Sequence, residues 1–156
     1  MRLLALALVA MVWSTASAQE GKPGENVLYL IEGGFRKAAS AQLVIASFDL
    51  TGNARIEQDL GTLTWRVGGW WPRKILVSTT VPGQSYGLTV EGRNAERGIP
   101  TGSVELVDGM LPRDFVRDIR PGNAQGRATL RYTATANITQ MAGEDNHIVT
   151  YTLTYQ

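Results

Sequence analysis

The chain has 156 residues, which is enough for one domain with a hydrophobic core and too few for two. Hydrophobic residues make up 44% of it, as in a globular protein, and the lack of cysteine excludes disulfides, thiol catalysis and Cys-ligated zinc. Fifteen Lys and Arg against fourteen Asp and Glu give a net charge of +1, which is too balanced to attract nucleic acid or an anionic membrane.

The first eighteen residues have the parts of a secretory signal peptide. Arg2 supplies the positive charge, residues 3–13 are continuously apolar, and Ala16-Ser17-Ala18 is a typical cleavage site. The apolar run is too short to anchor the chain in a bilayer. We therefore expect cleavage after Ala18 and a secreted, periplasmic or cell-surface bacterial protein, with a flexible tail at residues 19–26 and one domain at residues 27–156.

Alternating apolar residues and turn signals predict short strands along most of that domain. These strands are expected at residues 27–31, 38–47, 60–67, 74–81, 86–90 and 103–107. Residues 111–119 are the one helical candidate, because Pro112 suits a helix start and Leu111, Phe115 and Ile119 are spaced four apart; a loop is the alternative.

Residues 127–155 carry the clearest strand pattern. Every second residue from Ala128 to Ile138 is apolar, and Val149, Tyr151, Leu153 and Tyr155 alternate with threonines. The polar residues 143–146 lie between the two runs, so we expect two long strands joined as a hairpin. In total, seven to nine short strands predict an all-β fold, an antiparallel immunoglobulin-like sandwich. A small outer-membrane barrel is the competing architecture.

The strand at residues 128–136, followed by a polar turn and the strand at residues 149–155, resembles the end of secreted bacterial sandwiches of the spore coat protein U and fimbrial-subunit-like kind. This resemblance implies an immunoglobulin-like fold, export through the inner membrane, and a role in a surface layer or fibre.

Trp65, Trp70 and Trp71 form the best candidate for a surface site, with Arg73 beside them. Trp65 follows the strand alternation, which predicts a core position. Trp70 and Trp71 sit in a glycine-flanked loop, where both rings cannot easily enter one core. They are interpreted either as packing over the end of the sandwich or, with Arg73, as a platform for a glycan or a protein partner.

His147, with Glu144 and Asp145, is expected in a solvated turn, with a weak calcium site as the alternative. The sequence contains neither a Gly-x-Ser-x-Gly motif nor a phosphate or dinucleotide loop, so we expect no enzyme, catalytic residue, metal site or cofactor. The resulting prediction is a non-enzymatic structural or adhesive component of the cell surface or extracellular matrix. It would associate with itself or with another envelope protein. The alternative is a carbohydrate- or protein-binding module that uses Trp70 and Trp71.

Overall fold

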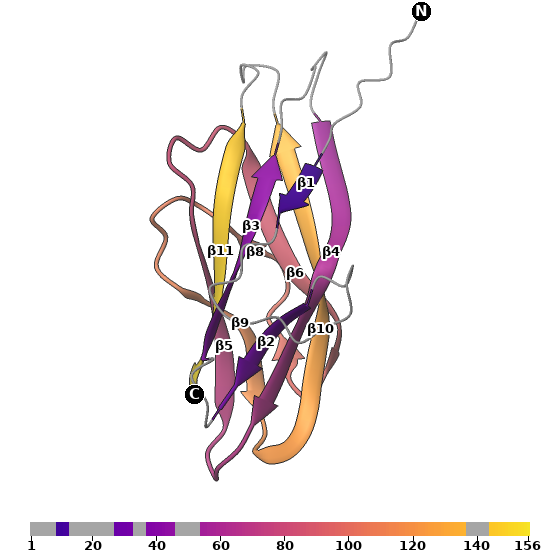
Figure 1. The fold of residues 1–156 in the computed structure, drawn as a ribbon, viewed down its shortest axis with the longest axis vertical. Coiled ribbons are helices and arrows are strands. Elements are labelled where there is room, and N and C mark those ends of the chain that lie inside the picture. Colours follow the sequence, from indigo (N-terminus) through magenta and orange to yellow (C-terminus); the bar gives the residue numbers. More distant parts are fainter. Residues whose placement is uncertain (1–8, 13–26, 33–36, 46–53, 137–143) are drawn as a thin grey trace, which may run out of the picture.

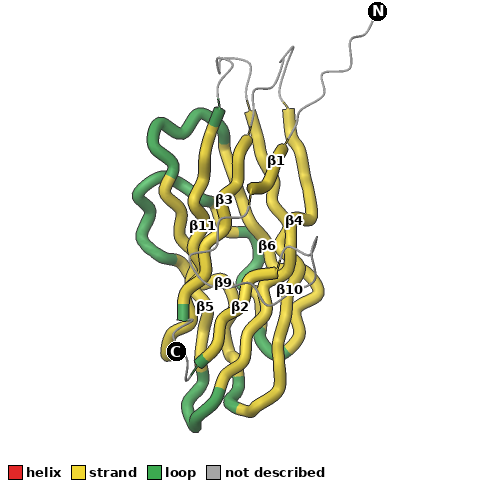
Figure 2. The backbone as a smooth tube through the Cα atoms, viewed as in Figure 1, coloured by secondary structure: helices red, strands yellow, loops and turns green. Residues whose placement is uncertain are grey.

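Two β-sheets face each other across one core in a computed structural model of the chain, which describes residues 9–12, 27–32, 37–45, 54–136 and 144–156 (Figure 1). The described residues form strands and connecting loops (Figure 2). The expected tail at residues 19–26 lies outside these residues. Among the described residues, no helix is long and apolar enough to span a membrane.

One sheet has six strands and the other has five. In spatial order the first contains β1 (Val9–Val12), β3 (Ala38–Ile45), β11 (Asp145–Tyr155), β5 (Arg73–Thr80), β9 (Arg113–Ile119) and β7 (Ile99–Pro100). The second contains β2 (Val27–Ile31), β4 (Ala54–Val67), β10 (Gly122–Ala136), β6 (Gly87–Glu96) and β8 (Val104–Glu105). Neighbouring strands are antiparallel, apart from the parallel pair of β2 and β4.

The all-β sandwich predicted from the sequence is therefore confirmed, but with eleven strands in the described residues instead of seven to nine. The additional strands are β1, β7 and β9, whereas β8 lies within the strand expected at residues 103–107. With two residues, β7 is too short to show alternation in the sequence. The boundaries of β2 agree with the expected 27–31.

The core is filled by the inward residues of both sheets, as the alternation predicts. On β10, Ala128, Leu130 and Tyr132 are buried, and on β11 Val149, Tyr151 and Leu153 are buried. The hydroxyls of Tyr132 and Tyr151 meet across the core at 2.7 Å. Burial raises the pKa of both phenols, so each stays neutral and satisfies the other.

The predicted hairpin at residues 127–155 was wrong. β10 pairs with β4 and β6 in one sheet, whereas β11 pairs with β3 and β5 in the other. Period-two alternation shows which face of a strand is buried. It does not show whether two such strands pair within one sheet or pack against each other from different sheets. Both β10 and β11 are paired along both of their sides, so they form the interior of the two sheets.

The helical candidate at residues 111–119 was also wrong, because residues 113–119 form β9. The register of β9 against β5 shifts between Val116 and Ile119, and Asp118 adopts a positive φ of 54°. A bulge of this kind adds a residue and breaks the period of two. Phe115, Val116 and Ile119 are thereby all buried while the two residues between them are exposed, and this spacing imitates one face of a helix in the sequence.

Candidate functional site

The tryptophan loop, residues 68–72, joins the end of β4 in one sheet to the start of β5 in the other. It lies at the lower end of the sandwich in Figure 1, near the C-terminus. Gly69 has a φ of 80°, a conformation that favours glycine and turns the chain between the sheets. This turn leaves Trp70 92% exposed and Trp71 69% exposed, whereas Trp65 on β4 is buried.

Trp65 is a core residue, as predicted. Its indole Nε1 donates a hydrogen bond to the carbonyl oxygen of Arg97 at 3.1 Å. Gly126 on β10 lies against the same ring, and a Cβ at that position would collide with it. The three tryptophans therefore divide as the sequence indicates, with one ring in the core and two in the loop.

Arg73 holds the loop in place from beneath. The side chain is buried, forms an ion pair with Glu32 just after β2, and donates from Nη1 to the carbonyl oxygen of Trp71 at 2.5 Å. Its guanidinium carbon lies 3.9 Å from the ring centroid of Tyr155. Arg73 thus neutralises a carboxylate and positions Trp71, and it is not available as an exposed ligand-binding cation.

Tyr155 and Gln156 bring the end of the chain beside the tryptophan loop. The Gln156 backbone N–H donates to the carbonyl oxygen of Pro72 at 3.3 Å. The Gln156 side-chain amide donates to Asp118 Oδ1 at 2.7 Å and accepts from the Asp118 backbone N–H at 3.0 Å. Trp71, Pro72, Tyr155 and Gln156 line an open hollow of about 470 Å³, which we call the aromatic hollow. Tyr155 and Gln156 were not singled out by sequence, because only pairing of β11 with β5 brings them here.

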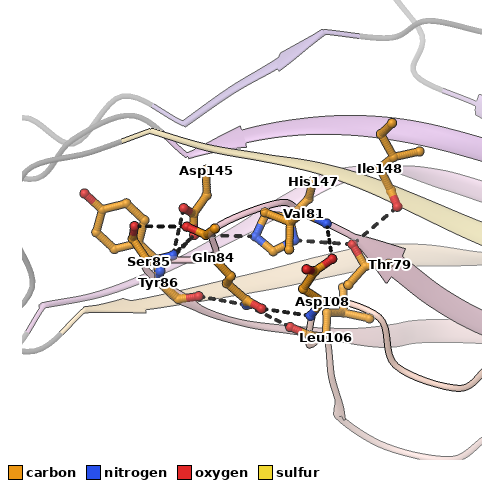
Figure 3. A network of polar contacts seen from close by, with 11 residues as sticks. Thr79, Val81, Gln84, Ser85, Tyr86, Leu106, Asp108, Asp145, His147 and Ile148 are labelled. Atoms are coloured by element: carbon orange, nitrogen blue, oxygen red, sulfur yellow. Dashed lines mark hydrogen bonds and ion pairs between the residues drawn. The ribbon is translucent and has the colours of Figure 1, made fainter.

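A second cluster of polar side chains lies at the start of β11, at the far end of that strand from Tyr155 (Figure 3). The length of β11 places the two clusters about 30 Å apart, since a strand rises about 3.4 Å per residue. Asp145 is buried, and its carboxylate accepts hydrogen bonds from the backbone N–H groups of Ser85 and Tyr86 at 2.8 to 2.9 Å. Asp145 thereby fixes the start of the segment that leads into β6.

His147 is buried beside Asp145, so the expectation that it lies in a solvated turn was wrong. Its Nδ1 lies 3.3 Å from the Thr79 hydroxyl, and its Nε2 is 3.8 Å from Asp145 Oδ2, without a hydrogen-bond partner among the described residues. Burial lowers the pKa of His147 to about 4, although Asp145 and Asp108 act in the opposite direction. The turn signal at residues 143–146 was misleading, because β11 already begins at Asp145.

Thr79, His147 and Asp145 have the residue types of a catalytic triad, but the geometry gives a substrate no access to them. All three side chains are buried, and the histidine–carboxylate distance is longer than a hydrogen bond. Within the described residues, no group of three or more His, Asp or Glu side chains is arranged as a metal site. The cluster is therefore part of the packing that orders this end of the fold.

Comparisons with known proteins return few findings. No protein-family model matches the chain, and no curated protein matches it. Among solved structures, the chain is similar to the crystal structure of Aeromonas hydrophila PliG, a periplasmic lysozyme inhibitor of g-type lysozyme. That match covers 84% of this chain and 100% of the other, with 13% identity and a TM-score of 0.24. A TM-score of this size carries no argument about the function of this chain.

Proposed function

We propose that this chain is a non-enzymatic, exported β-sandwich protein that acts as an adhesive component of the bacterial cell surface or extracellular matrix, and that it binds carbohydrate through Trp70 and Trp71. The observation that carries the proposal is the exposure of two adjacent indoles, at 92% and 69%, on one loop. Large exposed aromatic side chains on one surface are unusual unless a partner covers them.

The surroundings of the two rings favour a sugar over a charged ligand. The arginine beneath the loop is already paired with Glu32, so the side chains that line the aromatic hollow offer no free cation to an anion. Trp71 and Tyr155 supply apolar faces for the C–H side of a pyranose ring, while the side-chain amide of Gln156, which Asp118 holds in place, supplies a polar group for its hydroxyls. A volume of about 470 Å³ is within the range of small-ligand sites.

Export is proposed on the sequence of residues 1–18, with cleavage after Ala18. The finer immunoglobulin-like assignment also stays a prediction, because a parallel β2–β4 pair sits at one edge of the sandwich. The absence of a catalytic residue is likewise a prediction. An exported sandwich that presents an aromatic binding surface at one end would suit an adhesive role, in which the rest of the fold is a scaffold.

A glycan array with the fluorescently labelled protein tests the proposal. We expect wild-type protein to bind at least one class of glycan and Trp70→Ala/Trp71→Ala to lose that binding. Leu111→Ala is the matched control, because Leu111 is another highly exposed apolar side chain outside the hollow, and it should bind as wild type. Binding that survives the double substitution, or wild-type protein that binds no glycan on the array, would contradict a carbohydrate surface at this loop.

A further inference from the structure

β3 lies next to the four-residue terminal strand β1 and lacks the protection seen at the other sheet edges in the described part of the chain. Its eight residues, Ala38 to Ile45, include no charged residue and no proline, and its pairing with β11 runs in unbroken register. By contrast, β8 has two residues, β7 has two residues and ends in Pro100, and β2 is a five-residue parallel strand. Short edges, prolines and charges are the usual protection against edge-to-edge association.

The neighbouring edge of the other sheet shows that protection. Beyond its pairing with β2, the first half of β4 carries Arg55, Glu57 and Asp59. Arg55 pairs with Glu57, and Asp59 pairs with Arg131 on β10. The register of β4 against β10 also shifts near Gly61, which has a φ of 94°. Charges and a bulge therefore protect β4, and neither protects β3.

The outer side of β3 is covered by β1, which pairs with it in an antiparallel ladder from Val9 opposite Ile45 to Val12 opposite Gln42. β1 belongs to the segment expected to be removed by cleavage after Ala18. Export would therefore remove the one strand that, among the described residues, pairs with this side of β3. The backbone donors and acceptors of Gln42 to Ile45 that faced β1 would then lack a partner.

We propose that the mature chain forms a symmetric dimer in which β3 of one copy takes the place of β1 on β3 of the other. A two-fold axis across a strand pair makes the two strands antiparallel, which is the direction that this edge accepts from β1. β3 brings no charge to the junction, so two copies meet without like-charge repulsion. The dimer would leave the tryptophan loop of each copy free and so present two aromatic surfaces.

The inference rests on the proposed export, but not on carbohydrate binding, and the test separates the two. The full gene is expressed with its export signal, the protein is purified from the cell envelope or medium, and its intact mass identifies the N-terminus. Light scattering after size exclusion then gives the oligomeric state. We expect a chain that begins at Gln19 and is a dimer. A mass that retains residues 9–12 would refute the export step and with it the open edge, whereas a cleaved chain that stays monomeric at high concentration would refute the dimer alone.

Two substitutions locate the contact. Val44→Lys places two like charges at the β3–β3 junction and should give monomers. Ile148→Lys is the control, because Ile148 is a half-exposed residue of the same sheet on the interior strand β11, and its dimer should persist. Loss of the dimer in both variants would overturn edge pairing in favour of face-to-face contact.

Hydrogen exchange on the wild-type dimer provides the same test without substitution. Residues 42–45 should be protected in the dimer and should lose that protection on dilution to monomer. Exchange at these residues that is independent of concentration would overturn the proposal.

Discussion

Acid should destabilise the fold through the single buried histidine. In the unfolded chain His147 titrates at the ordinary histidine pKa of 6.5, whereas burial in the fold lowers that pKa to about 4. Between these two values the unfolded state binds a proton that the folded state does not. The contribution of His147 to the free energy of unfolding is therefore fully present above the unfolded-state pKa and is lost as the pH drops toward 4.

The magnitude follows from the separation of the two pKa values. Linkage gives a loss of about 2 kcal/mol by about pH 5 and a limit of about 3 kcal/mol in stronger acid. The charged groups that face the imidazole are Asp145 on its own strand and Asp108 after β8, and the Thr79 hydroxyl faces it from β5. Carboxylates titrate mainly below the window between about pH 7.5 and about pH 5, so the histidine dominates there.

Urea unfolding curves of wild type and His147→Gln across that window measure the effect. The substitution changes the absolute stability through both the packing and the hydrogen bond to Thr79, so the quantity to compare is the slope of the unfolding free energy with pH. Wild type should lose about 2 kcal/mol more than His147→Gln on going from about pH 7.5 to about pH 5. Equal slopes would show that His147 is not buried in its neutral form, which would refute the packing described for the start of β11.

Substitutions at three further contacts test what holds the fold and the loop. Gly126→Ala should destabilise by about 2 kcal/mol or more in thermal melts, because its Cβ would collide with the Trp65 ring; no change would mean that β10 does not approach this ring. Tyr132→Phe should cost about 1 to 2 kcal/mol and Tyr132→Phe/Tyr151→Phe less than the sum of the two single changes, and additive losses would contradict the buried hydroxyl pair. Arg73→Met should cost about 3 kcal/mol of stability, because it leaves its carboxylate partner buried without a cation. The variant should keep the β-sheet circular dichroism spectrum of wild type and bind glycan more weakly.

The two-sheet architecture could be predicted from the sequence, because local patterns decide which residues are buried. Alternation on β10 and β11 identified their inward residues, and the glycine-flanked loop separated Trp70 and Trp71 from Trp65. These are properties of a strand or a turn taken by itself, so a single sequence contains them.

The features that could not be predicted from the sequence depend on which strands pair. The assignment of β10 and β11 to different sheets, the burial of His147 and the position of Tyr155 beside the tryptophan loop all follow from pairings of strands far apart in the chain. Arg73 looked like a surface cation because its partner, Glu32, lies 41 residues earlier and meets it only in the folded sandwich. The bulge in β9 misled for a different reason, since one extra residue converts a strand period into a helical spacing.

The most direct test of the binding surface is acrylamide quenching of tryptophan emission, with and without the glycan selected on the array. In the free protein Trp70 and Trp71 should be quenched readily while buried Trp65 is protected. Saturating glycan should protect the two loop rings, and the same glycan should leave the quenching of Trp70→Ala/Trp71→Ala unchanged. Quenching that does not change when the glycan binds would place the binding surface elsewhere and contradict the proposed function.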